Sequence, residues 1–223
     1  MNLSSLLMKI YRTLRQAFGH RGWWPGETPF EVMVGAVLTQ RTNWGNVEKA
    51  IANLRDAGLM APDALARTEP ERLQALVRPA GYYRQKTARL LRLVTWLMDR
   101  AGGDIEALRE VPTDELRAEL LALSGIGPET ADSILLYAFG RATFVVDAYT
   151  KRIMARHELI DSACTYDELK DFFESNLPAD VELFKDYHAQ LVELGKRYCR
   201  TVPLCGTCPL HPLLGDPVRD EEL

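Results

Sequence analysis

Apolar residues recur at three- and four-residue spacing along nearly the whole chain, between frequent helix start and stop signals. Gly19 ends the first helix, and one apolar face of that helix is formed by Leu6, Leu7, Ile10, Tyr11, Leu14 and Phe18. The run from Thr28 to Glu31 combines an N-cap, a first-turn proline and a capping-box glutamate, so a second helix begins there. The pattern predicts an all-α chain of about a dozen helices.

The remaining helices follow from similar signals. They are predicted from Val47 to Gly58, from Pro62, from Glu69, from Arg84 to Arg100, after an N-cap at Thr113, over 148–156, after a capping box at Thr165, and up to about Tyr198. A strand-like pattern occurs only from Ala142 to Val146. That segment is too short and isolated to form a sheet.

The composition is that of a folded globular protein, because 47% of the 223 residues are hydrophobic and 26% are charged. One large or two small domains are expected. No apolar run approaches the roughly 20 residues that span a membrane, and the N-terminus lacks the apolar block of a signal peptide. We therefore expect a cytoplasmic protein with no membrane partner.

The net charge of −4 argues mildly against a nucleic-acid partner. Basic residues nevertheless gather between Arg78 and Arg92, and again between Lys196 and Arg200. Each group is either a phosphate-binding surface or an ordinary solvated helix face. Charge alone leaves both interpretations open.

Three of the four cysteines, Cys199, Cys205 and Cys208, fall within ten residues near the C-terminus. In a cytosolic chain such a group indicates a metal or iron–sulfur site more than a disulfide framework. Cys164 stands apart and is interpreted as a helix-flanking residue.

The segment from Leu123 to Ala131 joins two predicted helices through Gly125, Ile126 and Gly127. Two glycines around one apolar residue permit a tight turn. They also leave backbone N–H groups accessible to a DNA phosphate at the start of the next helix. Ile126 is expected to fill the gap between the two helices. The alternative is a plain αα-hairpin closed by glycines.

Asp147 follows the apolar run from Phe144 to Val146 and is expected to cap the helix over 148–156. A carboxylate at that point can also act in catalysis. Breaking an N-glycosidic bond builds positive charge on the sugar, which a nearby carboxylate stabilises while it orients or deprotonates a water. A simple capping role is the alternative.

The run from Leu123 to Arg152 resembles the helix–hairpin–helix and Gly-Pro-Asp element of the endonuclease III superfamily of DNA glycosylases. Gly35 to Gln40, Arg78 to Lys86, and His188 to Lys196 with the cysteines after it also resemble this superfamily. The resemblance is collinear across nearly the whole chain.

The resemblance implies two helical domains with a DNA-binding cleft between them. Residues 28–137 would form a helical barrel domain with the helix–hairpin–helix. Residues 138–223, completed by the N-terminal helix in 1–27, would form a helical domain with a cysteine-rich loop. The implied activity is base excision from double-stranded DNA, with the damaged base flipped out of the stack. The enzyme would act as a monomer and, in a bacterium, associate with the nucleoid.

The resemblance places Gln40 and Tyr82 where side chains enter the duplex and fill the space left by the extruded base. Without it, Gln40 is a polar residue at a helix C-terminus and Tyr82 a half-buried packing residue. The DNA-binding residues expected are Gln40, Tyr82, Arg84, Lys86, Gly125, Ile126, Gly127 and Thr130. Asp147 is the expected catalytic residue.

Glu129 stands where bifunctional members of the superfamily, which also cut the DNA backbone, carry a lysine that forms a Schiff base. A carboxylate cannot form an imine with the sugar. Lys151 and Lys196 are the nearest lysines along the chain, and neither matches the motif. The sequence therefore predicts a monofunctional glycosylase without AP lyase activity.

Trp23-Trp24-Pro25 and Trp44 resemble aromatic pocket positions of the bacterial 3-methyladenine DNA glycosylase branch. An N3-alkylated adenine is cationic, and stacking on indole rings contributes on the order of 1–3 kcal/mol per base. The predicted base pocket consists of Trp23, Trp24, Pro25, Trp44, Glu129 and Lys196.

Three alternatives stay open beside this pocket. Trp23 and Trp24 can instead serve interdomain packing. The chain can be an endonuclease III-like glycosylase for oxidised pyrimidines, with or without weak lyase activity. A non-catalytic protein that binds damaged DNA is the alternative from another class.

Iron–sulfur members of the superfamily carry the spacing C-x6-C-x2-C-x5-C. Here Cys199, Cys205 and Cys208 give C-x5-C-x2-C, and no further cysteine follows them. One interpretation is a [4Fe–4S] cluster whose fourth ligand is Asp216 or His211. Another is a degenerate site that binds no metal, and zinc would need the same missing ligand. A cluster would have a structural role, fixing a loop whose basic residues meet DNA.

Overall fold

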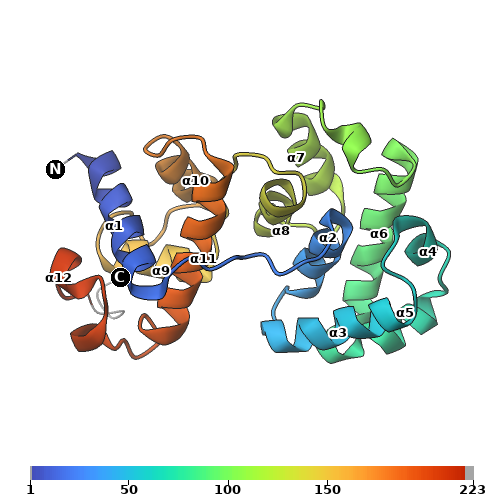
Figure 1. Cartoon of the computed structure of the whole chain (residues 1–223), viewed down its shortest axis with the longest axis horizontal. Helices are drawn as coiled ribbons and strands as arrows, with labels where there is room; N and C mark the ends of the chain where they lie inside the picture. The colour runs from blue at the N-terminus through green and yellow to red at the C-terminus, as the bar shows by residue number, and fades with distance from the viewer. Residues whose placement is uncertain (1, 219–223) are drawn as a thin grey trace. The chain divides into compact units, whose positions relative to one another are not determined.

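The computed structural model describes residues 2–218. Within that range the chain forms α-helices joined by turns and short loops, with one π-helical turn, η3 (Ile134–Ala138), and no β-strand (Figure 1). The α-helices are α1 (Leu3–Phe18), α2 (Pro29–Leu38), α3 (Trp44–Asp56), α4 (Pro62–Ala66), α5 (Pro70–Val77), α6 (Tyr83–Ala101), α7 (Thr113–Ala122), α8 (Pro128–Ser133), α9 (Ala148–Arg156), α10 (Tyr166–Glu174), α11 (Val181–Arg197) and α12 (His211–Leu214). The all-α prediction is confirmed. None of the helices in this range is long and apolar enough to cross a membrane.

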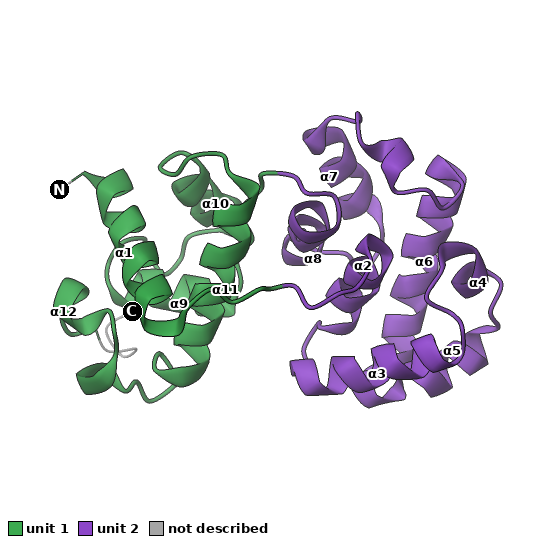
Figure 2. Cartoon of the chain, viewed as in Figure 1, with its two compact units in different colours: residues 1–23, 142–223 green, residues 24–141 purple. Residues whose placement is uncertain are grey.

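The chain divides into two compact units (Figure 2). Unit 1 contains residues 1–23 and 142–223, and unit 2 contains residues 24–141. The N-terminal helix α1 thus belongs with the C-terminal helices, and the hairpin belongs with α2 to α6. Each unit has its own set of packed helices.

The borders of unit 2 lie a few residues outside the 28–137 expected from the sequence, for a physical reason at each end. The Trp24 ring packs 5.4 Å from the Tyr137 ring, centroid to centroid, which ties the segment before α2 to unit 2. At the other end the Arg141 guanidinium donates to the carbonyl oxygens of Leu108 and Val111, at 3.1 and 3.0 Å.

Helix α2 lies at the centre of the unit 2 core, with every residue from Phe30 to Leu38 buried. Its predicted start is confirmed, because Thr28 Oγ1 accepts a hydrogen bond from the Glu31 N–H at 3.1 Å. The predicted capping-box role of the Glu31 side chain is wrong. Its carboxylate instead accepts two hydrogen bonds from Arg55 Nη2, both at 2.9 Å. A buried carboxylate needs a cation more than a second cap contact.

Two further helix starts were predicted from caps. The capping box at Thr165 is confirmed, since Thr165 Oγ1 accepts from the Glu168 N–H and the Glu168 carboxylate accepts from the Thr165 N–H. The N-cap at Thr113 is wrong by one residue, because Pro112 is the N-cap and Thr113 is the first residue of α7.

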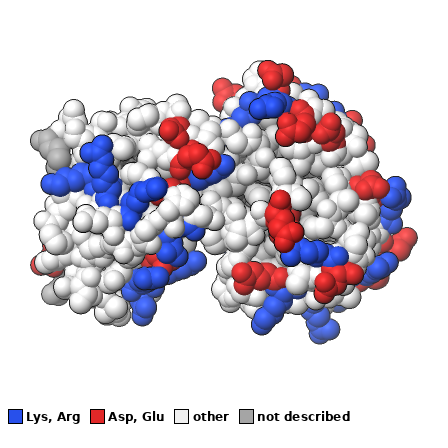
Figure 3. Space-filling view, viewed as in Figure 1, with Lys and Arg blue, Asp and Glu red and all other residues white. Residues whose placement is uncertain are grey.

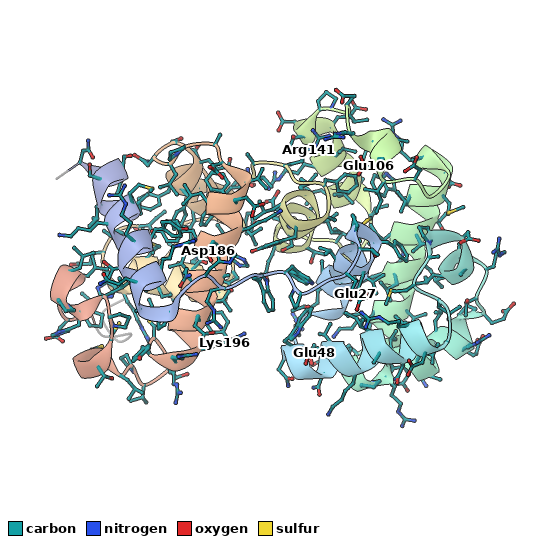
Figure 4. The ribbon with its side chains drawn as sticks, viewed as in Figure 1. Glu27, Glu48, Glu106, Arg141, Asp186 and Lys196 are labelled. Atoms are coloured by element: carbon teal, nitrogen blue, oxygen red, sulfur yellow. The ribbon has the colours of Figure 1, made fainter. Side chains whose placement is uncertain are left out.

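In unit 1, α1 packs against α11. Of the predicted apolar face of α1, Leu7, Ile10 and Leu14 are fully buried, whereas Leu6, Tyr11 and Phe18 are partly buried. The Asp186 carboxylate, labelled in Figure 4, accepts hydrogen bonds from the Arg21 backbone N–H and from the side chains of Tyr11 and Arg15. Burial raises the pKa of Asp186, but these hydrogen bonds outweigh it and hold the pKa below its usual value.

Candidate active site

The hairpin between α7 and α8 has the geometry expected of a helix–hairpin–helix. Gly125 adopts a φ of +93°, in the region that favours glycine. The Ile126 N–H closes the turn on the Leu123 carbonyl at 2.9 Å, and the Ile126 side chain is buried in the core of unit 2. A Cβ added at Gly127 would meet open space. The backbone at Gly127 is therefore accessible from outside.

The two helices of the hairpin are joined by a buried ion pair. Arg117 of α7 donates through Nε and Nη2 to the two carboxylate oxygens of Asp132, at 2.8 and 3.2 Å. The Asp132 side chain is completely buried, whereas a fifth of the Arg117 side chain is exposed. On the other side of the turn, Arg92 of α6 donates to the Ser124 carbonyl at 3.2 Å. The turn is thus fixed by a hydrogen bond from α6 and by the ion pair between α7 and α8.

Gln40 lies in the loop between α2 and α3 and is hydrogen-bonded to the hairpin. Its Nε2 donates to the Gly125 carbonyl at 3.1 Å and to Thr130 Oγ1 at 2.9 Å. Its Oε1 accepts a hydrogen bond from Arg89 of α6. The Arg89 side chain lies so close to Gly125 that an added Cβ there would be 2.5 Å from its Nε. The structure thus brings Gln40, Gly125 and Thr130 into one network.

Tyr82 and Arg84 are both exposed, in and next to the loop before α6. Tyr82 is 58% exposed and adopts a left-handed backbone, with φ at +45°. A large non-glycine residue in that region is unusual. The exposure leaves Tyr82 available to a ligand, as the expectation of a duplex-entering side chain requires.

Lys86 departs from its predicted DNA-binding role. Its side chain is fully buried, and Nζ donates to the Leu38 carbonyl at 2.8 Å and the Ala80 carbonyl at 2.6 Å. Burial, followed by the nearby charge of Arg89, lowers the pKa of Lys86 to about 8. The phosphate contact predicted for Lys86 is therefore wrong. The ammonium instead satisfies carbonyls at the ends of two segments, as helix ends require.

Asp147 caps α9 and faces a buried histidine of α11. Its Oδ1 accepts hydrogen bonds from the Thr150 N–H and hydroxyl, at 2.7 and 2.8 Å. Its Oδ2 lies 3.8 Å from His188 Nε2, too far for a hydrogen bond. Burial lowers the pKa of His188, and Lys196 lowers it further, while Asp147 raises it. One carboxylate oxygen is therefore used by the cap and the other is not.

A close contact between α9 and α11 sets the position of Asp147. A Cβ added at Gly195 of α11 would lie 2.3 Å from the Tyr149 ring, so only glycine fits there. The guanidinium of Arg152 lies over the Tyr149 ring, with its central carbon 5.2 Å from the ring centroid. Arg152 Nε also donates to the Cys199 carbonyl at 2.9 Å. The first turn of α9 is thus held directly on α11.

Among the predicted pocket residues, Trp24 and Trp44 lie together in unit 2. Their rings meet edge to face at 5.3 Å, and Trp24 also contacts the Tyr137 ring. A Cβ added at Gly35 of α2 would be 3.1 Å from Trp24 Nε1. Tyr137 was missed by the sequence analysis. Its run in the sequence is uniformly apolar, and Tyr137 lies in the π-helical turn η3, where the α-helical spacing used for the prediction does not apply.

Trp23 and Lys196 lie together in unit 1. Lys196 Nζ, labelled near the C-terminal end of α11 in Figure 4, is 5.7 Å from the Trp23 ring centroid. The dipeptide Trp23-Trp24 is therefore split between the two units. Pro25 is exposed next to it, and Glu129 is exposed on the first turn of α8.

The cysteine-rich loop is fixed by arginines of α9. Arg156 is almost fully buried and donates to Cys199 Sγ at 3.4 Å and to the Thr201 carbonyl at 3.2 Å. Burial raises the pKa of the Cys205 and Cys208 thiols, and the neighbouring thiols raise it further.

The two residues considered as a fourth cluster ligand bind each other, because His211 Nε2 lies 3.1 Å from Asp216 Oδ1. Over residues 2–218 no three His, Cys, Asp or Glu side chains are grouped closely enough to hold a metal ion. Three thiols and a carboxylate have suitable donor chemistry for an iron–sulfur cluster. They are not gathered around one point.

Side chains of opposite charge are mixed on the surface of unit 2 (Figure 3). On the face shown in Figure 3, acidic and basic side chains are interspersed over unit 2. This mixture explains why the net charge of −4 gives no indication of a phosphate-binding surface. Arg92, which donates to the Ser124 carbonyl, is an exposed basic residue at the hairpin.

The comparisons with known proteins agree with this arrangement. The pattern of the HhH-GPD superfamily of base excision DNA repair proteins matches residues 34–179. The chain is 47% identical to a protein of Methanocaldococcus jannaschii that is a DNA repair glycosylase by name, over 94% of this chain and 96% of that protein. It is 35% identical to Endonuclease III of Thermotoga maritima, over 81% of this chain and 79% of that protein.

A crystal structure of the 3-methyladenine DNA glycosylase MagIII of Helicobacter pylori superposes with a TM-score of 0.77. The two are 30% identical, over 88% of this chain and 98% of MagIII. The chain belongs to the HhH-GPD superfamily of base excision DNA repair proteins, as the endonuclease III-like motifs predicted. It is a DNA glycosylase of the endonuclease III superfamily.

Proposed function

We propose that this glycosylase is monofunctional and removes alkylated purines such as 3-methyladenine from duplex DNA. The observation that carries the proposal is Glu129. It occupies the first turn of α8, where the bifunctional members of the superfamily carry the Schiff-base lysine. Because a carboxylate cannot form an imine, the N-glycosidic bond is broken by water.

The aromatic residues support an alkylated purine as the substrate. Trp24, Trp44 and Tyr137 offer ring faces and edges in unit 2, and Trp23 offers another in unit 1. Electron-poor alkylated bases gain from such rings through stacking and cation–π attraction. The MagIII structure was determined with a modified adenine, 1,N6-ethenoadenine, bound.

In the proposed mechanism the Asp147 carboxylate supplies the negative charge that stabilises the sugar cation. Its Oδ1 is fixed by Thr150, so Oδ2 is the oxygen that faces the sugar or orients the attacking water. Burial favours the neutral form of His188. A neutral His188 leaves the negative charge of Asp147 available to stabilise the sugar cation. An alkylated base is a good leaving group, so little acid assistance is required.

The hairpin and the exposed Tyr82 hold the DNA in this proposal. The open backbone at Gly127, beside Gly125 and Thr130, binds a phosphate through N–H groups. Exposed Arg84 adds a charge contact near Tyr82. Tyr82 enters the duplex and replaces the flipped base in the stack.

The substrate is tested by identifying the bases released from two duplexes, one methylated and one carrying oxidised pyrimidines. We expect release of 3-methyladenine from the first and none from the second, because aromatic rings bind an electron-poor alkylated base in preference to an oxidised pyrimidine. Release from the second duplex alone would favour an activity like that of Endonuclease III. Binding of both duplexes without any release would make the chain a non-catalytic binder of damaged DNA.

We also propose a [4Fe–4S] cluster held by Cys199, Cys205 and Cys208, with Asp216 as the fourth ligand. Support comes from the spacing of the three cysteines within ten residues and from the suitability of thiolates as ligands for iron. The role proposed is structural, and no catalytic step passes through it.

The cluster is tested by iron and sulfide analysis of protein purified without oxygen. Wild-type protein and Cys164→Ser are expected to contain iron, because Cys164 lies outside the loop. Cys205→Ser is expected to lose it. Wild-type protein that takes up no iron and sulfide even after chemical reconstitution would contradict the proposal.

A further inference from the structure

We propose that Glu174 and Tyr166, both of helix α10, are positioning residues that set the direction of the Asp147 carboxylate. They bind the backbone of residues 143–146, which run directly into Asp147. The inference rests on the catalytic role proposed for Asp147, and it is independent of which damaged base is removed.

The strand-like sequence over residues 142–146 forms no strand in the structure, although its last four residues are buried. Buried backbone N–H groups need acceptors, which a strand obtains from its neighbour. Side chains of α10 supply them here. Glu174 Oε1 accepts from the Phe144 N–H at 2.6 Å, and the Tyr166 hydroxyl accepts from the Val146 N–H at 3.3 Å. Helix α10 thus takes the place of a neighbouring strand.

Glu174 is itself held in a defined orientation. Its Oε2 accepts from Lys170 Nζ at 2.9 Å, one turn earlier on α10. Its Oε1 accepts from the Thr143 hydroxyl at 3.1 Å in addition to the backbone contact. The Phe144 ring stacks on the Phe173 ring of α10, with 4.0 Å between the ring centroids. The segment before Asp147 is therefore fixed on α10 by polar and aromatic contacts together.

The direction of the Asp147 side chain depends on the chain on both of its sides. Asp147 is the N-cap of α9, with φ at −116° and ψ at 178°, so its own backbone is not helical. On one side lies α9, which is held on α11 by the close contact at Gly195. On the other side lies Val146, which Tyr166 holds on α10. The α10 contacts thus fix the side of Asp147 that the α9–α11 contact does not, and with it the direction of Oδ2.

Loss of the Glu174 carboxylate is expected to affect the rate more than the binding of DNA. The Phe144 N–H and the Thr143 hydroxyl would lose their acceptor, and a buried segment with such groups has to shift. A displacement of about 1 Å far from the chemistry can cost about 10²-fold in rate. Phosphate contacts, which supply most of the affinity for duplex DNA, are made elsewhere.

The first test is single-turnover release of the damaged base, together with Kd for duplex DNA. Glu174→Ala is expected to lower the rate by about 10–100-fold and to leave Kd unchanged. Glu174→Gln keeps an acceptor oxygen in the same place and is expected to keep most of the rate. Asp171→Ala is the matched control, because Asp171 is exposed on α10 and accepts from the Ser175 hydroxyl instead of the segment.

A second test does not depend on the identity of the damaged base. A duplex with a pyrrolidine in place of one sugar carries a positive charge like that of the transition state, whereas a tetrahydrofuran gives the same ring without the charge. Wild-type protein is expected to bind the cationic duplex at least about 10²-fold more tightly, as for a transition-state analogue. Asp147→Asn is expected to lose this preference, Glu174→Ala to lose most of it, and Asp171→Ala to keep it.

Two further variants separate positioning from general stability. In an Asp147→Asn background, Glu174→Ala is expected to have no additional effect on the preference, because no charge is left to direct. Tyr166→Phe removes a single hydroxyl acceptor and is expected to weaken the preference in a protein that stays folded, so it repeats the test if Glu174→Ala unfolds.

Full rate and full preference in both Glu174→Ala and Tyr166→Phe would overturn the proposal. A loss of rate with an unchanged preference for the cationic duplex would also overturn it, because the effect would then not pass through the carboxylate. Retention of the preference by Asp147→Asn would contradict the role of Asp147 and the inference with it. Release of a different base, with the preference following Glu174 as expected, would overturn only the proposed substrate.

Discussion

Replacing Asp147 with asparagine is expected to lower the rate of base release by on the order of 10²–10⁴-fold. Asparagine keeps the size of the side chain and caps a helix as well as aspartate does, so α9 should remain folded. What is lost is the negative charge at Oδ2, which stabilises the sugar cation and directs the water. Single-turnover release of the base from methylated duplex DNA measures the change.

A matched control is the same substitution at Asp180, which caps α11 by accepting from the Leu183 N–H at 3.0 Å. Asp180→Asn alters an exposed cap and is expected to leave the rate unchanged. The Asp147→Asn protein should still bind duplex DNA, because removing a negative charge adds no repulsion between the protein and the DNA phosphates. Full activity in Asp147→Asn would show that Asp147 serves only as a cap.

Much of this site could be predicted from the sequence because its signals are local. The turn at Gly125 to Gly127 and the cap at Asp147 each depend on residues within a few positions, and the structure has both. The helix pattern was equally local, so the fold class followed from it. The helix caps were predicted least accurately, because Pro112 and not Thr113 is the N-cap of α7 and the Glu31 side chain pairs with Arg55.

The contacts that the sequence did not predict join distant segments. Lys86 was expected on the surface because it lies among arginines in a basic run, yet its ammonium satisfies carbonyls in two other segments. Tyr137, in the π-helical turn, contacts the Trp24 ring from more than a hundred residues away along the chain. The Gln40 hydrogen bonds cross from the α2–α3 loop to the hairpin. Spacing along one chain contains no signal for such pairs.

The second prediction is that the protein has no AP lyase activity. An imine with an abasic sugar requires a neutral amine at the position of the attacking residue, and Glu129 offers only oxygen. Lys86 has the lowered pKa of an amine nucleophile, but its Nζ is fully buried between two carbonyls. Lys196 lies over the Trp23 ring. We expect no backbone cleavage at abasic sites and no covalent intermediate.

Borohydride trapping on an abasic-site duplex tests the hydrolytic mechanism most directly, because only an imine is reduced to a stable adduct. The wild-type protein is expected to give no adduct, while Glu129→Lys, which restores an amine at that position, is expected to give one. Glu158→Lys, with the same charge change at an exposed turn after α9, serves as the control and should give none. A trapped adduct with the wild-type protein would contradict the account.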